Sequence, residues 1–402
     1  MYKLEQNDKL GFYTVGTKKF YGKVEALMEA TRTGEFPIWQ YNRQIFDNID
    51  WTIEPAVPLR ELYRMRAQQL RDRYDWIRIE ASGGGDSTTA LLSFLNNGIH
   101  IDEVVFRYPK TGEKNVHNDP YNTKCENTLS EWEFAAKPLL NWIATHHPRT
   151  KITVHDYSEN MLNQGLDETW VFKTKDYFQP GHCFKHDNVG FDDHRRDADR
   201  GKKICVLYGI DKPRMCVKDN KWFVYFMDLQ ANHSNSVVYD YDNIHNEYFY
   251  WSPDLPELIC KQAHIIKNWF MMPQNKALQF VLKWPNNSIA NRTTYEQMVK
   301  PLIYPDYDPA TFQVIKPSNS FYNEMDYWFY VNFKETEVYK TWQAGLDLLV
   351  KSIDDKYFNK EMGRPVGFVG FISPFYYLGS STYTTTGVND FKRFTQDPVE
   401  IG

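Results

Sequence analysis

The sequence predicts an α/β fold in which a parallel sheet of about five strands carries helices on both faces. Short runs rich in β-branched and aromatic residues alternate along the chain with segments of helical periodicity. A glycine-rich turn joins the first of these strands directly to a helix. Because strands that alternate with helices pair in parallel through right-handed crossovers, we expect ligands at the carboxyl ends of the strands.

The α/β core is expected to cover residues 76–220. Its predicted strands lie at residues 76–81, 104–108, 152–155 and 204–208, and its main helices at residues 87–95 and 129–146. Apolar residues recur at helical spacing within 129–146, whereas 204–208 is the continuous apolar run typical of a buried parallel strand. Residues just after each strand are therefore candidate site residues.

Two extensions flank this core. Residues 1–75 are expected to form a small N-terminal unit, with a strand near 12–16 and helices over 23–31 and 59–73. Residues 221–402 form an aromatic-rich region that we assign to substrate specificity or interaction. Its predicted strands lie at 221–226, 237–239 and 248–251, and its predicted helices at 256–272, 276–282 and 342–357. The stretch 284–330 is rich in Pro, Asn and Tyr and is expected to be irregular, and 368–383 is expected to be an extended tail.

Composition narrows the class of protein. The formal net charge of −5 argues against a large nucleic-acid surface and favours a small-molecule substrate. No apolar stretch approaches the length of a membrane span, and the polar start is unlike a signal peptide. We therefore expect a cytoplasmic protein without membrane association.

Cysteine and histidine residues give no pattern of a disulfide or metal site. The five cysteines lack CxxC spacing and are expected to be reduced thiols: Cys125, Cys183, Cys205, Cys216 and Cys260. Several side chains of metal-ligand type lie close together in the sequence: His182, Cys183, His186, Asp187 and His194. Because no standard ligand spacing is met, we interpret this stretch as a polar loop and predict no zinc.

The run Ser82–Ser87 has the chemistry of a phosphate site. Glycines at 83, 84 and 85 let the backbone approach a ligand, and the following helix offers unpaired N–H groups and a partial positive charge. Ser82, Ser87 and Thr88 can add hydroxyl donors. An acid beside a polyanion is unusual, so Asp86 is expected to cap the helix or to hold a bridging Mg²⁺. A chance serine- and glycine-rich turn is the competing interpretation.

This run resembles the PP-loop ATP pyrophosphatase superfamily, whose signature Ser-Gly-Gly-x-Asp-Ser is matched in full by Ser82–Ser87. The resemblance implies an adenine nucleotide alpha hydrolase-like core that cleaves ATP between the α and β phosphates and adenylates an acceptor. Members include asparagine synthetase and 7-cyano-7-deazaguanine synthase, and the continuation through Thr88 and Thr89 is most similar to the latter. That branch carries a C-terminal cysteine cluster for zinc, whereas this chain has no cysteine after Cys260.

The end of the fourth predicted strand adds charged candidates. Gly209 is followed by Asp211, Lys212 and Arg214 in a proline-containing turn. In PP-loop proteins this strand end commonly faces pyrophosphate and Mg²⁺. The resemblance therefore implies that Asp211 holds the metal, and that Lys212 and Arg214 stabilise the departing pyrophosphate. An exposed charged loop is the competing interpretation.

Together these residues predict an ATP- and Mg²⁺-dependent enzyme. Asp86, Lys212 and Arg214 are the expected catalytic residues, and Arg107, after the second strand, is an expected contact for adenine or ribose. The acceptor would be a small molecule or a nucleobase with a carboxylate or carbonyl oxygen, attacked in turn by ammonia or an amine. Tyr2 stands where glutamine-dependent relatives have a catalytic cysteine, so a separate glutaminase would supply ammonia. A homo-oligomer is compatible with these expectations.

Two alternatives stay open at this point. A sulfur-transfer enzyme, similar to tRNA thiolases or sulfonucleotide reductases, would need a reactive cysteine, and Cys125 or Cys183 would have to serve. A nucleotide-binding protein without turnover would use the loop only to hold ATP.

Overall fold

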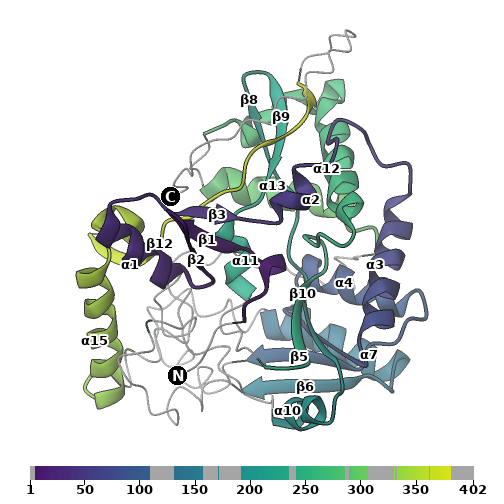
Figure 1. The fold of residues 1–402 in the computed structure, drawn as a ribbon. Helices are drawn as coiled ribbons and strands as arrows, with labels where there is room; N and C mark the ends of the chain where they lie inside the picture. The colour runs from purple at the N-terminus through teal and green to yellow at the C-terminus, as the bar shows by residue number, and fades with distance from the viewer. Residues whose placement is uncertain are drawn as a thin grey trace, which may run out of the picture.

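A five-stranded parallel sheet lies at the centre of the computed structural model, in the order β10-β7-β4-β5-β6. The model describes residues 5–108, 131–156, 192–234, 241–285, 289–306, 333–361 and 363–381, with the single residues Val171 and Tyr330. The strands are β4 (Trp76–Glu80), β5 (Glu103–Tyr108), β6 (Lys151–Asp156), β7 (Ile204–Tyr208) and β10 (Ile244–Tyr248). Helices flank this sheet (Figure 1), so the predicted α/β fold is confirmed.

The strand order reverses direction between β4 and β7. From β4 the chain adds β5 and β6 on one side, then returns to place β7 on the other side of β4 and β10 beyond it. Glu80 of β4 lies opposite Tyr208 of β7 in register, so the two strands end at the same level. The segments that follow them leave the sheet side by side. Such a reversal is where open parallel sheets bind ligands.

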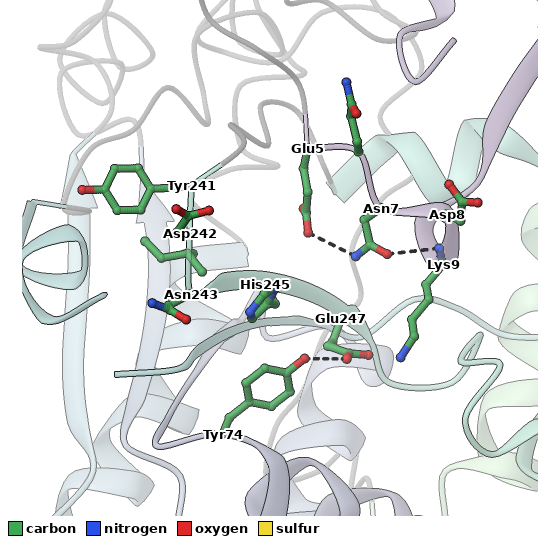
Figure 2. A pocket seen from close by; sticks show the side chains of 12 residues that line it. Glu5, Asn7, Asp8, Lys9, Tyr74, Tyr241, Asp242, Asn243, His245 and Glu247 are labelled. Atoms are coloured by element: carbon green, nitrogen blue, oxygen red, sulfur yellow. Dashed lines mark hydrogen bonds between the residues drawn. The ribbon is translucent and has the colours of Figure 1, made fainter. Parts of the chain in front are cut away.

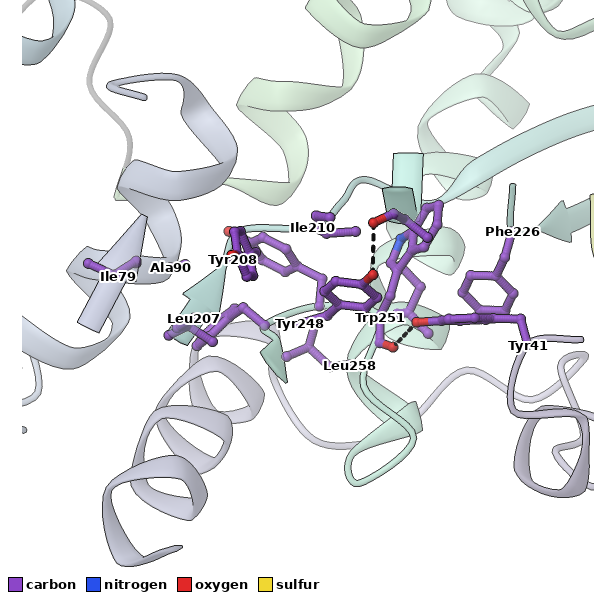
Figure 3. Close-up of a cluster of buried hydrophobic side chains, with 14 of the residues drawn as sticks. Tyr41, Ile79, Ala90, Leu207, Tyr208, Ile210, Phe226, Tyr248, Trp251 and Leu258 are labelled. Carbon is purple, nitrogen blue, oxygen red and sulfur yellow. Dashed lines mark hydrogen bonds between the residues drawn. The ribbon is translucent and has the colours of Figure 1, made fainter. Parts of the chain in front are cut away.

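Five helical segments accompany these strands. They are α3 (Leu59–Arg73), α4 (Gly85–Leu95), η3 (Glu131–Ala136), α7 (Lys137–His146) and α10 (Asp192–Asp199). Helix α4 is buried along its whole length except at Asp86. Figure 3 shows Ala90 of α4 beside Ile79 of β4 in the central core. Each large apolar side chain buried here contributes about 1.5–3 kcal/mol, which fixes the position of α4 on the sheet.

The N-terminal residues form a small antiparallel sheet and short helices. The elements are η1 (Asp8–Leu10), β1 (Phe12–Val15), β2 (Lys18–Phe20), α1 (Lys23–Thr33), β3 (Ile38–Gln40) and α2 (Arg43–Phe46). Their aromatic side chains pack against the C-terminal half: Tyr41 contacts Phe226 and donates a hydrogen bond of 2.5 Å to the Trp251 carbonyl (Figure 3). The high aromatic content therefore serves packing here.

The C-terminal half adds helices and two further antiparallel sheets. The strands are β8 (Arg214–Lys218), β9 (Lys221–Tyr225), β11 (Phe358–Glu361), β12 (Arg364–Phe368) and β13 (Tyr376–Ser380). The helical elements are α11 (Asp228–Ser234), α12 (Pro256–Met271), η5 (Pro273–Leu282), α13 (Ile289–Ile303), α15 (Glu337–Ser352) and η6 (Asp355–Tyr357). In Figure 1, α1 and α15 lie on the side of the molecule opposite to α3 and α7.

Several sequence predictions for this half are wrong. The stretch expected to be irregular contains α13, which packs against α12 and η5 and buries Tyr295 and Val299. The expected tail contains β13, which pairs with β9. The strand predicted at 248–251 lies instead at 244–248 and is the fifth strand of the parallel sheet, beyond the expected core range of 76–220. The strand predicted at 237–239 lies outside the described residues.

Candidate active site

The turn after β4 is shaped by its glycines and serines. Gly83 has a φ of +73°, and a Cβ there would lie 2.9 Å from the backbone of Ala135. The Ser82 N–H donates to Ser87 Oγ at 3.1 Å, and the Gly84 N–H donates to Ser82 Oγ at 3.3 Å. The serine hydroxyls therefore hold the turn in shape and are close to the start of α4.

The first turn of α4 offers donors for an anion. Gly84 precedes the helix in an extended conformation and no side chain caps it. The Thr88 N–H makes the first bond within the helix, to the Gly84 carbonyl at 3.0 Å. The N–H groups of the residues before Thr88 therefore have no carbonyl partner within α4. These donors and the helix dipole favour a negatively charged ligand at this point.

Asp86 does not cap the helix, contrary to one of the two roles expected for it. Its carboxylate instead accepts hydrogen bonds from Lys212 Nζ, at 2.8 Å to each oxygen, and from the Tyr304 hydroxyl. The Tyr250 hydroxyl donates to the backbone carbonyl of Asp86 at 2.8 Å. The Asp86 side chain is 25% exposed, so one part of it faces the site.

The segment after β7 lies directly against the start of α4. A Cβ at Gly209 would come within 2.8 Å of the Asp86 and Ser87 backbones. Lys212 Nζ also donates to Asp211 at 2.9 Å, and Arg214 Nη2 donates to the same carboxylate at 2.9 Å. The structure thus brings Asp86 together with Asp211, Lys212 and Arg214, which lie more than 120 positions further along the sequence.

Burial and ion pairing set the protonation states of this cluster. Burial opposes ionisation of Asp211, but Lys212 and Arg214 outweigh it and lower the pKa of Asp211. Burial likewise opposes the charge of Lys212, and its two carboxylate neighbours raise the pKa of Lys212. Burial raises the pKa of Asp86, and the negative charge of Asp211 adds to this rise, so that Lys212 offsets it only in part. Asp211 and Lys212 therefore stay charged at neutral pH.

Helix α13 and the residue that follows it supply three site residues that the sequence analysis missed. Glu296 and Lys300 lie four residues apart on one face of α13, and Tyr304 continues this spacing directly after the helix ends at Ile303. Glu296 accepts a hydrogen bond of 2.9 Å from Arg214 Nη1, and Tyr304 contacts Asp86. Their spacing is a helical signal, but the Pro- and Asn-rich surroundings favoured an irregular segment.

Arg107 lies apart from this cluster. It stands near the end of β5 and donates to both carboxylate oxygens of Glu80, from Nε at 3.0 Å and from Nη2 at 3.2 Å. Glu80 also pairs with Arg78 at 2.9 Å. Arg107 is thereby fixed to Glu80, the last residue of β4, and its buried Nη1 has no hydrogen-bond partner among the described residues.

The carboxylates of Asp86 and Asp211 could supply some, but not all, of the ligands of a Mg²⁺ ion. Among the described residues, no group of three or more His, Cys, Asp or Glu side chains is arranged to hold a metal ion. Mg²⁺ usually takes one or two carboxylates and fills its remaining positions with water and phosphate oxygens. Asp86 and Asp211, which share Lys212, fit that requirement.

The remaining metal-type residues are either structural or lie outside the described chain. His194 lies on α10, is buried, and contacts Glu103 at 2.8 Å. His182, Cys183, His186 and Asp187 lie outside the described residues, as does Cys125.

In the described part of the chain, no helix is long and apolar enough to cross a membrane.

A separate cavity of about 820 Å³ lies beside β10, where it is lined by the N-terminal segment, by Tyr74 and by residues before and within the strand. Figure 2 shows Glu5, Asp242, His245 and Glu247 around it. Glu247 is engaged by Tyr74 at 2.7 Å and by arginines of α3. Because no residue of the cluster around Asp86 lines it, this cavity is distinct from that cluster.

No protein-family model matches the chain, and no curated protein is significantly similar to it.

Proposed function

We propose that the protein is an ATP-dependent adenylating enzyme, which cleaves ATP to AMP and pyrophosphate and activates a carboxylate or carbonyl acceptor for a nitrogen nucleophile. One observation carries the proposal. A glycine turn leads into the buried helix α4 at the reversal of a parallel sheet, and Asp86 meets Asp211 and Lys212 there. This arrangement supports the proposal because it offers N–H donors to phosphate oxygens and carboxylates to Mg²⁺.

The proposed roles follow from the contacts. The free N–H groups at the start of α4 bind phosphate oxygens, and Asp86 and Asp211 hold Mg²⁺, which neutralises phosphate charge. The acceptor oxygen attacks the α-phosphorus, and the bond to the bridging oxygen breaks as pyrophosphate leaves. Nitrogen then displaces AMP from the adenylate. Because the reaction depends on positioning and charge, no general base is required in the first step.

The other participants are proposed from the same chemistry. Arg107, held by Glu80 at the end of β5, is the proposed contact for adenine or ribose. The acceptor is a small molecule or a nucleobase, and ammonia or an amine comes from a separate source such as a glutaminase. A cytoplasmic location, where ATP and Mg²⁺ are abundant, suits this reaction.

The proposal is tested with ATP labelled at the α or the γ phosphate. The wild-type protein with Mg²⁺ and a pool of metabolites and nucleosides should release AMP and pyrophosphate. Asp86→Asn should lower the rate by about a hundredfold or more, because it removes a charge from the centre of the site. Asp347→Asn is the control, since Asp347 is an exposed residue of α15 and its loss should leave the rate unchanged.

Other products would contradict the proposal. Release of ADP and phosphate would exclude cleavage between the α and β phosphates. Tight ATP binding with no turnover for any acceptor would instead favour a nucleotide-binding protein without catalysis.

A further inference from the structure

Three cations lie near the start of α4, and two of them, Lys212 and Arg214, are paired with carboxylates. Lys212 has three N–H donors, and all three are used, at 2.8 Å to each oxygen of Asp86 and at 2.9 Å to Asp211. Lys212 is only 5% exposed. Binding of phosphate by this ammonium would break an ion pair that holds both aspartates in place.

Arg214 is also paired with carboxylates, through both of its terminal nitrogens. Its Nη1 donates to Glu296 and its Nη2 donates to Asp211, both at 2.9 Å. Its side chain is 9% exposed, and its buried Nε has no hydrogen-bond partner among the described residues. Arg214 therefore fixes the orientation of Asp211 and connects it to α13, while a donor stays unused inside the cluster.

Lys300 differs from both. It lies on α13 above the glycine turn, with its Cδ 3.6 Å from the place where a Cβ of Gly85 would be. In the described part of the chain, its ammonium takes part in no hydrogen bond or ion pair. Burial, together with the nearby charge of Lys212, lowers the pKa of Lys300, because the surrounding carboxylates compensate this cation incompletely.

We infer that Lys300 binds the β- and γ-phosphates of ATP, whereas Lys212 and Arg214 are positioning residues that hold Asp86 and Asp211. The inference rests on the proposed function and assigns phosphate binding to Lys300 instead of Lys212 and Arg214. A lysine ammonium with free donors is a mobile point charge that suits a phosphate chain. The neighbouring N–H groups of α4 bind the same anion from the other side. The absence of a side chain at Gly85 lets the Tyr304 ring and the Lys300 side chain lie directly against the start of α4.

The test compares ligands that differ in their phosphates. Binding of ATP, AMP and inorganic tripolyphosphate, each with Mg²⁺, is measured by calorimetry for the wild type, Lys300→Met and Lys300→Arg. Lys300→Met should weaken ATP and tripolyphosphate by about tenfold or more, because a charge-assisted hydrogen bond is lost. AMP affinity should change less than twofold, and Lys300→Arg should restore most of the ATP affinity. Lys351→Met, at the exposed end of α15, is the control.

The outcomes separate this inference from the proposed function. If Lys300→Met binds ATP as the wild type does while Asp86→Asn abolishes pyrophosphate release, the role of Lys300 is wrong and the proposed function stands. Equal losses for ATP and AMP would also overturn it, since they indicate a general disturbance of the site. If the wild type binds neither ATP nor tripolyphosphate, the proposed function itself fails. Thermal unfolding of each variant verifies that it is folded, and Lys300→Gln replaces Lys300→Met if that variant is not.

Discussion

At the scale of single residues, Gly83 determines how the turn after β4 is made. Its φ of +73° is accessible to glycine at little cost, and the backbone of Ala135 occupies the space where a side chain would begin. The turn therefore depends on glycine for two separate reasons, conformation and close approach.

The two reasons can be separated by comparing Gly83→Ala with Gly98→Ala. Gly98 has a similar φ of +68° but nothing within 4 Å of its Cβ position. Gly98→Ala should cost about 1 kcal/mol from backbone strain alone, and Gly83→Ala about 3 kcal/mol, because the contact with Ala135 adds to that strain. Urea denaturation measures both values. Equal costs would mean that Ala135 moves away freely.

The described cysteines are unsuited to sulfur chemistry. Cys205, Cys216 and Cys260 are buried thiols. Burial raises the pKa of each, to about 12 for Cys260, so the reactive thiolate is scarce at neutral pH. A sulfur-transfer mechanism would have to use the two remaining cysteines.

A variant with Cys125→Ser and Cys183→Ser tests this distinction. With a thiol reagent such as DTNB, the folded variant should react slowly, and the unfolded variant should show the three remaining thiols. The variant should also keep the pyrophosphate-releasing activity. Loss of that activity with the fold intact would favour the sulfur-transfer alternative.

At the scale of elements, α12 is tied to the N-terminal residues through a buried histidine. His264 is 2% exposed and its Nε2 lies 2.9 Å from the Trp51 carbonyl. Burial, aided by Lys267, lowers the pKa of His264 to about 4, so the folded state holds the neutral ring. The unfolded chain would bind a proton near pH 6.5.

Folding stability should therefore fall as the pH drops from 6.5 towards 4. Below pH 6.5 the His264 ring is protonated in the unfolded state but stays neutral in the folded state, and this difference in proton binding favours unfolding. Between pH 7 and pH 4.5 this group should cost about 2 kcal/mol. His264→Gln keeps a donor for Trp51 and lacks the titration, so its stability should fall less over this range. An identical decrease for both proteins in urea denaturation would contradict the assignment.

Local sequence patterns predicted the elements that carry the loop but not those that face it. The strand β4, the turn and α4 are contiguous, so periodicity and glycine chemistry were sufficient. The polar sequence of β10, Ile-His-Asn-Glu-Tyr, gave no strand signal because β10 is an edge strand whose pairing with β7 supplies its stability. Helix α13 forms because packing against α12 overrides its Asn and Pro content.

The same limit applies to the site residues. Asp211, Lys212 and Arg214 could be proposed because they follow a predicted strand, and parallel strands end at one edge. Glu296, Lys300 and Tyr304 follow no strand, and only the tertiary fold brings them to Asp86. The pairing of Lys212 with Asp86 could not be predicted from the sequence either, because it depends on which basic side chain the fold brings within 3 Å of the carboxylate.

At the scale of the whole molecule, one carboxylate joins three parts of the chain. Asp228 at the start of α11 pairs with Lys23 at 2.8 Å, and both side chains are fully buried. It also accepts hydrogen bonds from the Tyr13 hydroxyl at 2.7 Å and the Phe371 N–H at 2.8 Å. The N-terminal sheet, α11 and the segment before β13 therefore depend on each other for their placement, since a buried charge must keep its partners.

The contact of Gly209 with the first turn of α4 has a consequence for how the site can change. Two main chains touch there without side chains between them, so the loop and the end of β7 form one fixed surface. The opposite surface is built from side chains of α13, which can be exchanged without moving a strand. Substitutions along α13 can thus alter the site without moving the sheet, whereas any side chain at position 209 would push the end of β7 and the start of α4 apart.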